Sequence, residues 1–126
     1  MKAIIIDDDR KAINDLTDKL SKHEDIEVVA TTTSASFGLK MLQTEVPDLM
    51  FLDVEMPEMT GLELLETLRK DKKSDVYFVI LSGYADFSYA QQAMQNDCTD
   101  YILKPVDKEM LLKVLSKVLV LKNEKN

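Results

Sequence analysis

Aspartates directly follow two of the most apolar runs in the sequence. Asp7 to Asp9 come after AIII, and Asp53 comes after LMFL. Carboxylates crowded into one cleft repel one another and raise one another's pKa unless a cation neutralises them. An all-oxygen site of this kind suits Mg²⁺, which typically keeps several of its waters. The two motifs therefore predict a magnesium site, provided that the fold brings them together.

A hydroxyl and an ammonium group follow two further apolar runs. Ser82 comes after VYFVIL, and Lys104 comes after DYIL. A lysine beside carboxylates and a metal can stabilise a transferring phosphoryl group, whose charge is spread over three oxygens. Asp53 would be the nucleophile, because a carboxylate is already ionised at neutral pH and needs no base.

Each of these residues also has an ordinary structural interpretation. The acids at 7–9 can cap a helix, and Asp53 and Ser82 can be turn residues. Lys104 can be a surface lysine whose stem lies along apolar neighbours. Chance is a poor explanation for all of them at the ends of four strands, so a functional site is favoured.

Strand-length apolar runs alternate along the chain with segments of helical period. The runs lie at 3–6, 26–30, 49–52, 76–81 and 100–103. Between the first two, Ile13, Leu16 and Leu20 have the spacing of one helix face, and similar segments begin near 34, 61, 86 and 107. The alternation predicts an α/β fold with a (βα)5 pattern.

A (βα)5 chain is expected to form a doubly wound parallel five-stranded sheet in the order 2-1-3-4-5, which is the flavodoxin-like arrangement. In that order the first and third strands are neighbours where the strand order reverses, and ligands bind there. Asp7, Asp8 and Asp53 should therefore meet. We expect one domain over 1–122 and a polar tail at 123–126.

Four blocks of the sequence resemble the signatures of response-regulator receiver domains of two-component signalling. The blocks are DDD at 7–9, LDVEMPEMTG from Leu52, LSGYADFSYAQQAM from Leu81 and DYILKPVD from Asp100. Their order and spacing also fit, and they span nearly the whole chain. The resemblance implies the receiver fold and a regulatory phosphoacceptor domain that catalyses only its own phosphorylation and dephosphorylation.

The resemblance also assigns roles to the acidic cluster. It implies that Asp53 is the phosphoacceptor and that Lys104 pairs with the phosphoryl group. Mg²⁺ would be coordinated by Asp8, by Asp53 and by the backbone carbonyl of Glu55. Asp7 would assist through water.

A conformational switch is implied as well. Ser82 would move toward the phosphoryl group while Tyr101 turns inward, which would reshape the face of the fourth helix, fifth strand and fifth helix. Added charge can bias an element with two arrangements in this way. Tyr101 can equally be an ordinary half-buried strand tyrosine. The Lys104–Pro105 bond is expected to be cis, which an X-Pro bond makes accessible.

Further residues near the site are expected to modulate it. Glu55 and Tyr84 each lie two positions beyond a key residue, and in the family such positions tune how long the phosphate lasts. Asp9 replaces the glutamate that is common in the family but keeps a carboxylate. Met56 belongs to the loop that leads into the third helix.

The composition excludes several classes of protein. In 126 residues, 23 acidic side chains outnumber 16 basic ones and give a net charge of −7, so the chain has no basic footprint for nucleic acid. The lone Cys98 cannot form an internal disulfide, which makes a reducing cytoplasm the expected compartment. No apolar run approaches the roughly 18 residues of a membrane span. We therefore expect no direct nucleic-acid or membrane binding.

The resemblance implies a sensor histidine kinase as phosphodonor and a DNA-binding output domain, absent from this chain, that would control transcription. A phosphorylation-dependent homodimer is a further option. An unphosphorylated receiver-like binding module would need a missing acceptor or lysine, and neither is missing. A Mg²⁺-dependent phosphatase with an aspartate nucleophile resembles Asp-x-Asp-x-Thr/Val, whereas here Asp7 and Asp9 are followed by Lys11.

Overall fold

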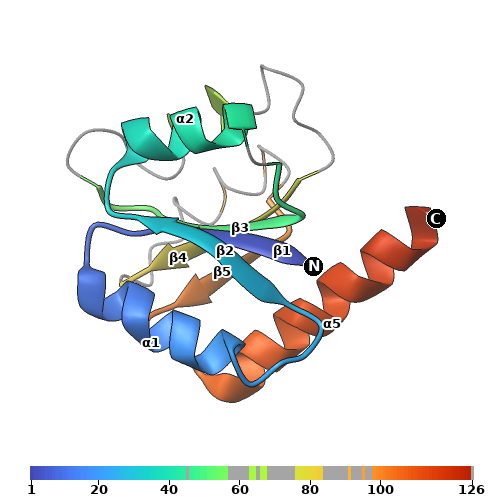
Figure 1. Cartoon of the computed structure of the whole chain (residues 1–126). Helices are drawn as coiled ribbons and strands as arrows, with labels where there is room; N and C mark the ends of the chain where they lie inside the picture. Colours follow the sequence, from blue (N-terminus) through green and yellow to red (C-terminus); the bar gives the residue numbers. More distant parts are fainter. Residues whose placement is uncertain are drawn as a thin grey trace.

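The fold is that of a computed structural model, which describes residues 1–44, 46–56, 63–64, 66–67, 76–83, 91, 95 and 98–125 (Figure 1). Its elements are β1 (Lys2–Ile6), α1 (Arg10–Leu20), β2 (Glu27–Thr32), α2 (Ala35–Thr44), β3 (Leu49–Asp53), β4 (Tyr77–Ser82), β5 (Asp100–Leu103) and α5 (Lys108–Lys125).

All five strands are parallel and form one sheet in the order β2-β1-β3-β4-β5, which confirms the predicted fold class. The helices α1 and α5 cover one face of the sheet, and α2 covers the other (Figure 1). Both faces are thus protected, as a parallel sheet requires. The carboxyl ends of β1 and β3 lie side by side, because Ile6 pairs in register with Leu52.

The core lies in two layers because successive side chains of a strand point to opposite faces of the sheet. On the α2 side, Ile4 packs with Met50 and Phe78, while on the α1 and α5 side Ile5 packs with Phe51. All of these side chains are fully buried. Near-continuous apolar runs are therefore required in the central strands, and this is the pattern that the sequence carries.

Acidic side chains cap two of the helices. Asp9 is the N-cap of α1, and its carboxylate accepts a hydrogen bond of 3.0 Å from the backbone N–H of Lys11. Asp107 stands before α5 and accepts a bond of 2.8 Å from the backbone N–H of Glu109. These caps satisfy N–H groups that have no partner inside the helix.

Some boundaries differ from the expected ones. The strand β2 continues through Thr31 and Thr32, because these polar but β-branched residues pair with Ile5 and Ile6 at the sheet edge. The helix α5 extends to Lys125, so residues 123–125 continue the last helix. The proposed domain limit at 122 stays a prediction.

The third and fourth expected helices are described only in part. Residues 63–64, 66–67, 91 and 95 are helical, while Tyr84 and the rest of these segments lie outside the described residues. None of the helices in the described part of the chain has the length and apolarity that crossing a membrane requires.

Candidate functional site

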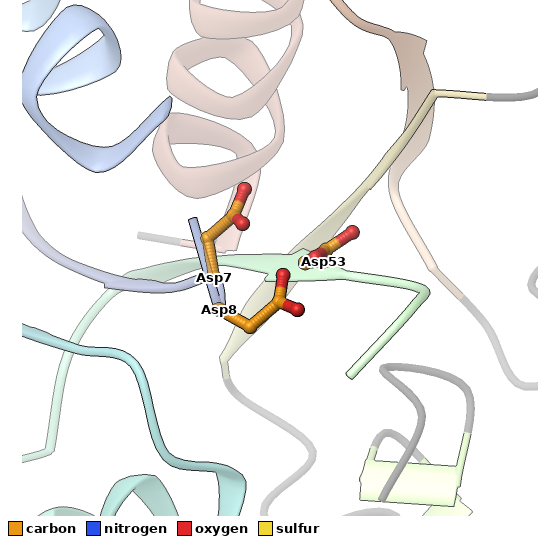
Figure 2. Close-up of side chains that lie close together, drawn as sticks. All are labelled: Asp7, Asp8 and Asp53. Carbon is orange, nitrogen blue, oxygen red and sulfur yellow. The ribbon is translucent and has the colours of Figure 1, made fainter. Parts of the chain in front are cut away.

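Three aspartate carboxylates gather at the carboxyl ends of β1 and β3 (Figure 2). One oxygen from each of Asp7, Asp8 and Asp53 lies within 4.8 Å of the others. Asp7 and Asp53 are buried, with 0% and 3% of their surfaces exposed, whereas Asp8 is exposed. The structure therefore brings the three residues together at the point where the strand order reverses.

The pKa of Asp53 shows how crowded this cluster is. Burial, the side chain of Asp8 and the charge of Asp7 together raise the pKa of Asp53 to about 7. The backbone N–H of Glu55, which donates to Asp53 Oδ1 at 3.2 Å, and the charge of Lys104 lower the pKa but do not offset these effects. Lys104 thus does not fully neutralise the negative charge of the three carboxylates. Their all-oxygen donor set fits Mg²⁺.

A single lysine contacts both buried carboxylates. Lys104 Nζ lies 2.6 Å from Asp7 Oδ2 and 3.3 Å from Asp53 Oδ1. Burial alone would lower the pKa of Lys104, but the contacts with Asp7 and Asp53 outweigh it and raise the pKa above its ordinary value. Lys104 therefore keeps its positive charge beside the expected nucleophile.

The backbone places Lys104 directly after β5. Its N–H donates to the carbonyl oxygen of Ser82 at 2.7 Å, which ties the residue to the end of β4. The Lys104–Pro105 peptide bond is cis. Ser82 is fully buried at this end of the sheet. The residues at the ends of β4 and β5 therefore lie at the same edge of the sheet as the aspartates.

The other expected site residues surround this cluster. Tyr101 is half-buried and packs against the core on the α2 side, and Met56 is buried in the same core. Glu55 is half-buried, and its Oε1 is buried without a hydrogen-bond partner among the described residues. The side chain of Asp9 caps α1 instead of joining the three carboxylates. The modulating role of Tyr84 stays a prediction.

A contact that the sequence did not predict is made by Val106, two residues after Lys104. Lys19 of α1 donates from Nζ to the carbonyl oxygen of Val106 at 2.7 Å, across 87 positions of sequence. In the sequence Lys19 is an ordinary basic residue in the last turn of a helix. Neither its type nor its spacing indicates a partner so far along the chain.

Comparisons with known proteins show the family to which the chain belongs. The family described as response regulator receiver domain matches residues 3–116. An uncharacterized response regulatory protein of Vibrio vulnificus is 41% identical over 118 residues, which cover 94% of this chain and 47% of that protein. The transcriptional regulatory protein BtsR of Escherichia coli is 34% identical over 118 residues, with 94% and 48% covered.

A solved structure has the same fold. It is a DNA-binding response regulator of the LuxR family from Staphylococcus aureus, with a TM-score of 0.85, 30% identity, and 93% of this chain and 97% of that chain covered. The chain spans about half the length of the curated relatives that it matches. Because the family matches residues 3–116 and the chain has the five-stranded fold, the chain belongs to the receiver domain family of response regulators.

Proposed function

We propose that this chain is a phosphorylation-controlled signalling switch in which Asp53 accepts a phosphoryl group. The observation that carries the proposal is the position of Lys104, whose ammonium contacts both buried carboxylates at the end of the sheet. A cation fixed in this place can hold an oxygen of the incoming phosphoryl group beside Asp53.

The carboxylate cluster supports Mg²⁺ as the cofactor. Asp8, Asp53 and the backbone carbonyl of Glu55 would coordinate the ion, and Asp7 would assist through water. Bound there, Mg²⁺ would neutralise charge on the phosphoryl oxygens and on the acidic cluster. The pKa of about 7 for Asp53 supports this assignment, because a buried acid beside two others needs a further cation to stay ionised.

The reaction needs no separate general base. An oxygen of ionised Asp53 attacks phosphorus, and the bond from phosphorus to the donor breaks as the new oxygen–phosphorus bond forms. The donor's leaving group keeps the bonding electron pair, and the product is an acyl phosphate. Lys104 contributes a charge that is already in place, so that little rearrangement is needed during transfer.

The expected donor is the phosphohistidine of a sensor histidine kinase. Ser82 and Tyr101 would then move. The face formed by the expected fourth helix, β5 and α5 would bind different partners or pair with a second copy of the chain. Because BtsR is named a transcriptional regulatory protein, we propose transcription as the output, through a DNA-binding domain outside this chain. The compartment would be the cytoplasm, which suits a buried Cys98 that forms no disulfide. In this role the chain catalyses only its own phosphorylation and dephosphorylation.

Intact mass spectrometry after incubation with acetyl phosphate and Mg²⁺ tests the acceptor. We expect the wild-type chain to gain the mass of one phosphoryl group, and we expect no gain when EDTA is present from the start. Asp53→Asn should gain nothing, because an amide cannot form the acyl phosphate. Asp18→Asn removes the same charge from an exposed position on α1 and should be phosphorylated like the wild type.

Two results would contradict the proposal. A full gain of mass in Asp53→Asn would place the acceptor elsewhere in the chain. No gain in the wild type, with Mg²⁺ binding still measurable, would favour the receiver-like binding module, which works without phosphorylation.

A further inference from the structure

The segment that carries Lys104 is tied to α1 by one charged side chain. Lys19 Nζ donates to the carbonyl oxygen of Val106 and lies 2.7 Å from Asp15 Oδ2. The side chain of Lys19 is 17% exposed and that of Asp15 is 53% exposed. Water therefore screens the ion pair with Asp15, whereas the bond to Val106 is partly buried. A hydrogen bond from an ammonium to a partly buried carbonyl is stronger than one between neutral groups.

The packing around this contact is open. A cavity of about 340 Å³ lies between α1 and the segment 104–106, lined by Asp9, Lys11, Ala12, Asp15, Leu16, Leu81, Lys104, Pro105 and Val106. Asp15 and Val106, the two residues that Lys19 contacts, are among those that line the cavity. Packing still holds part of the segment, because Val106 is buried in the same core layer as Leu16 and Leu20 of α1. The bond from Lys19 adds a backbone contact to that packing.

Two hydrogen bonds bracket Lys104 along the chain. On one side its own N–H donates to the carbonyl oxygen of Ser82. On the other side, two residues later, the carbonyl oxygen of Val106 accepts from Lys19. The helix α1, which carries Lys19, is fixed against the sheet because Ile13, Leu16 and Leu20 are buried in the core.

We infer that Lys19 is a positioning residue for Lys104, and the inference rests on the proposed phosphoryl transfer to Asp53. Lys19 holds the segment after β5 so that the Lys104 ammonium reaches Asp7 and Asp53 at once. Without this bond the backbone at 104–106 can shift while the side chain of Val106 stays packed in the core, and the ammonium leaves its place beside the nucleophile. Small misplacements of catalytic groups slow reactions markedly.

Lys19→Met tests this role, because it keeps most of the stem and removes the donor. The initial rate of phosphorylation by acetyl phosphate in Mg²⁺ should fall about tenfold. Lys19→Arg keeps a donor on a long stem and should restore most of the rate. Asp15→Asn removes the ion-pair partner but leaves the bond to Val106, so its rate should stay at the wild-type level.

A second measurement separates positioning from a general loss of stability. Amide hydrogen exchange over residues 103–107 should be faster in Lys19→Met than in Ile13→Val, which destabilises the same helix without touching the contact with Val106. Ile13→Val should also be phosphorylated at the wild-type rate.

Two results would overturn the inference: a wild-type rate in Lys19→Met, or equal slowing in Ile13→Val. If the wild-type chain takes up no phosphate, the proposed function fails by itself. The exchange comparison then decides whether Lys19 holds the segment, and unchanged exchange in Lys19→Met would overturn the positioning role.

Discussion

Asp53 is subject to two opposing demands in the cation-free protein. It must be ionised to act as a nucleophile, yet burial and the neighbouring acids Asp8 and Asp7 favour its protonated form. The pKa of about 7 lies above the 3.8 of an exposed aspartate. Between pH 3.8 and about pH 7, Asp53 is therefore protonated in the folded protein but ionised in the unfolded chain.

This raised pKa predicts a stability that falls as pH rises. Below the unfolded pKa both states are protonated and the group contributes nothing, whereas through the range from about 4 to about 7 the folded state loses stability. In Mg²⁺-free buffer at pH 8, Asp53→Asn should therefore be more stable than the wild type by roughly 1–4 kcal/mol, the upper figure being the full pKa shift converted to free energy. Urea unfolding at pH 4 to 8 measures this difference, which should shrink toward pH 4.

Addition of Mg²⁺ should stabilise the wild type more than it stabilises Asp53→Asn. A cation that binds only the folded state stabilises it by mass action. The wild type keeps the carboxylate that the Asp53→Asn variant lacks, so the unfolding midpoint of the wild type should rise more. The control variant Asp18→Asn changes an exposed position on α1. It should show neither the gain in stability at alkaline pH nor the altered response of the unfolding midpoint to Mg²⁺. A difference that is the same at every pH would show that Asp53 titrates normally.

Close contact between α2 and β1 depends on a residue without a side chain. A Cβ atom added at Gly38 would overlap Cδ1 of Ile6 and lie 3.2 Å from its Cγ1. Ile6 is fully buried, so it cannot turn away into solvent. Gly38 therefore sets how near α2 lies to the sheet, next to the strand that ends in the acidic cluster.

Gly38→Ala should destabilise the fold by about 1 kcal/mol. Overpacking a core costs about 1–3 kcal/mol, and the better helix propensity of alanine offsets up to about 1 kcal/mol of that. Urea unfolding measures the net change. Gly83→Ala is a matched control, because a Cβ there meets nothing within 4 Å and the effect should stay within about 0.5 kcal/mol. A more stable Gly38→Ala would show that α2 can shift outward at little cost.

Asp48 joins the last helix to the start of the sheet. Lys122 of α5 donates to Asp48 Oδ1 at 2.9 Å, and the backbone N–H of Lys2 donates to Oδ2 at 2.7 Å. The carbonyl oxygen of Asp48 accepts from the N–H of Tyr77 at 2.9 Å. One residue thus links β1, β4 and α5 at the edge opposite the acidic site.

This network predicts an acid-sensitive contribution to stability. Burial raises the pKa of Asp48, but the hydrogen bonds from Lys122 and Lys2 outweigh it and leave the pKa below its ordinary value. The contribution is therefore present above about pH 4 and is lost as pH falls through the folded pKa. Lys122→Met should cost roughly 0.5–1 kcal/mol at pH 7, and less at pH 3 or in 1 M salt.

Urea unfolding of Lys122→Met at these pH values and salt concentrations measures the loss. Lys113→Met removes an exposed lysine from the same helix and should have little effect at either pH. Equal losses in the two variants would show that net charge, and not the contact with Asp48, sets the stability of α5.

Much of this protein follows from local sequence patterns. Apolar runs of strand length between helical segments were sufficient for the sheet order, because few topologies satisfy short right-handed connections. The same reasoning predicts that Asp7, Asp8 and Asp53 lie together, since the carboxyl ends of neighbouring parallel strands share an edge. Strand ends do not follow from the local pattern: β2 extends through polar threonines because they pair with β1.

Contacts between distant, chemically ordinary residues follow from the three-dimensional fold and not from local sequence. The bond from Lys19 to Val106 joins residues 87 positions apart, and the bond from Lys122 to Asp48 joins residues 74 apart. A lysine on a helix surface has the same local pattern whether or not a partner lies across from it. Three-dimensional packing alone brings the partner within reach, and so it alone determined which lysines hold the segment behind Lys104 and the end of α5 in place.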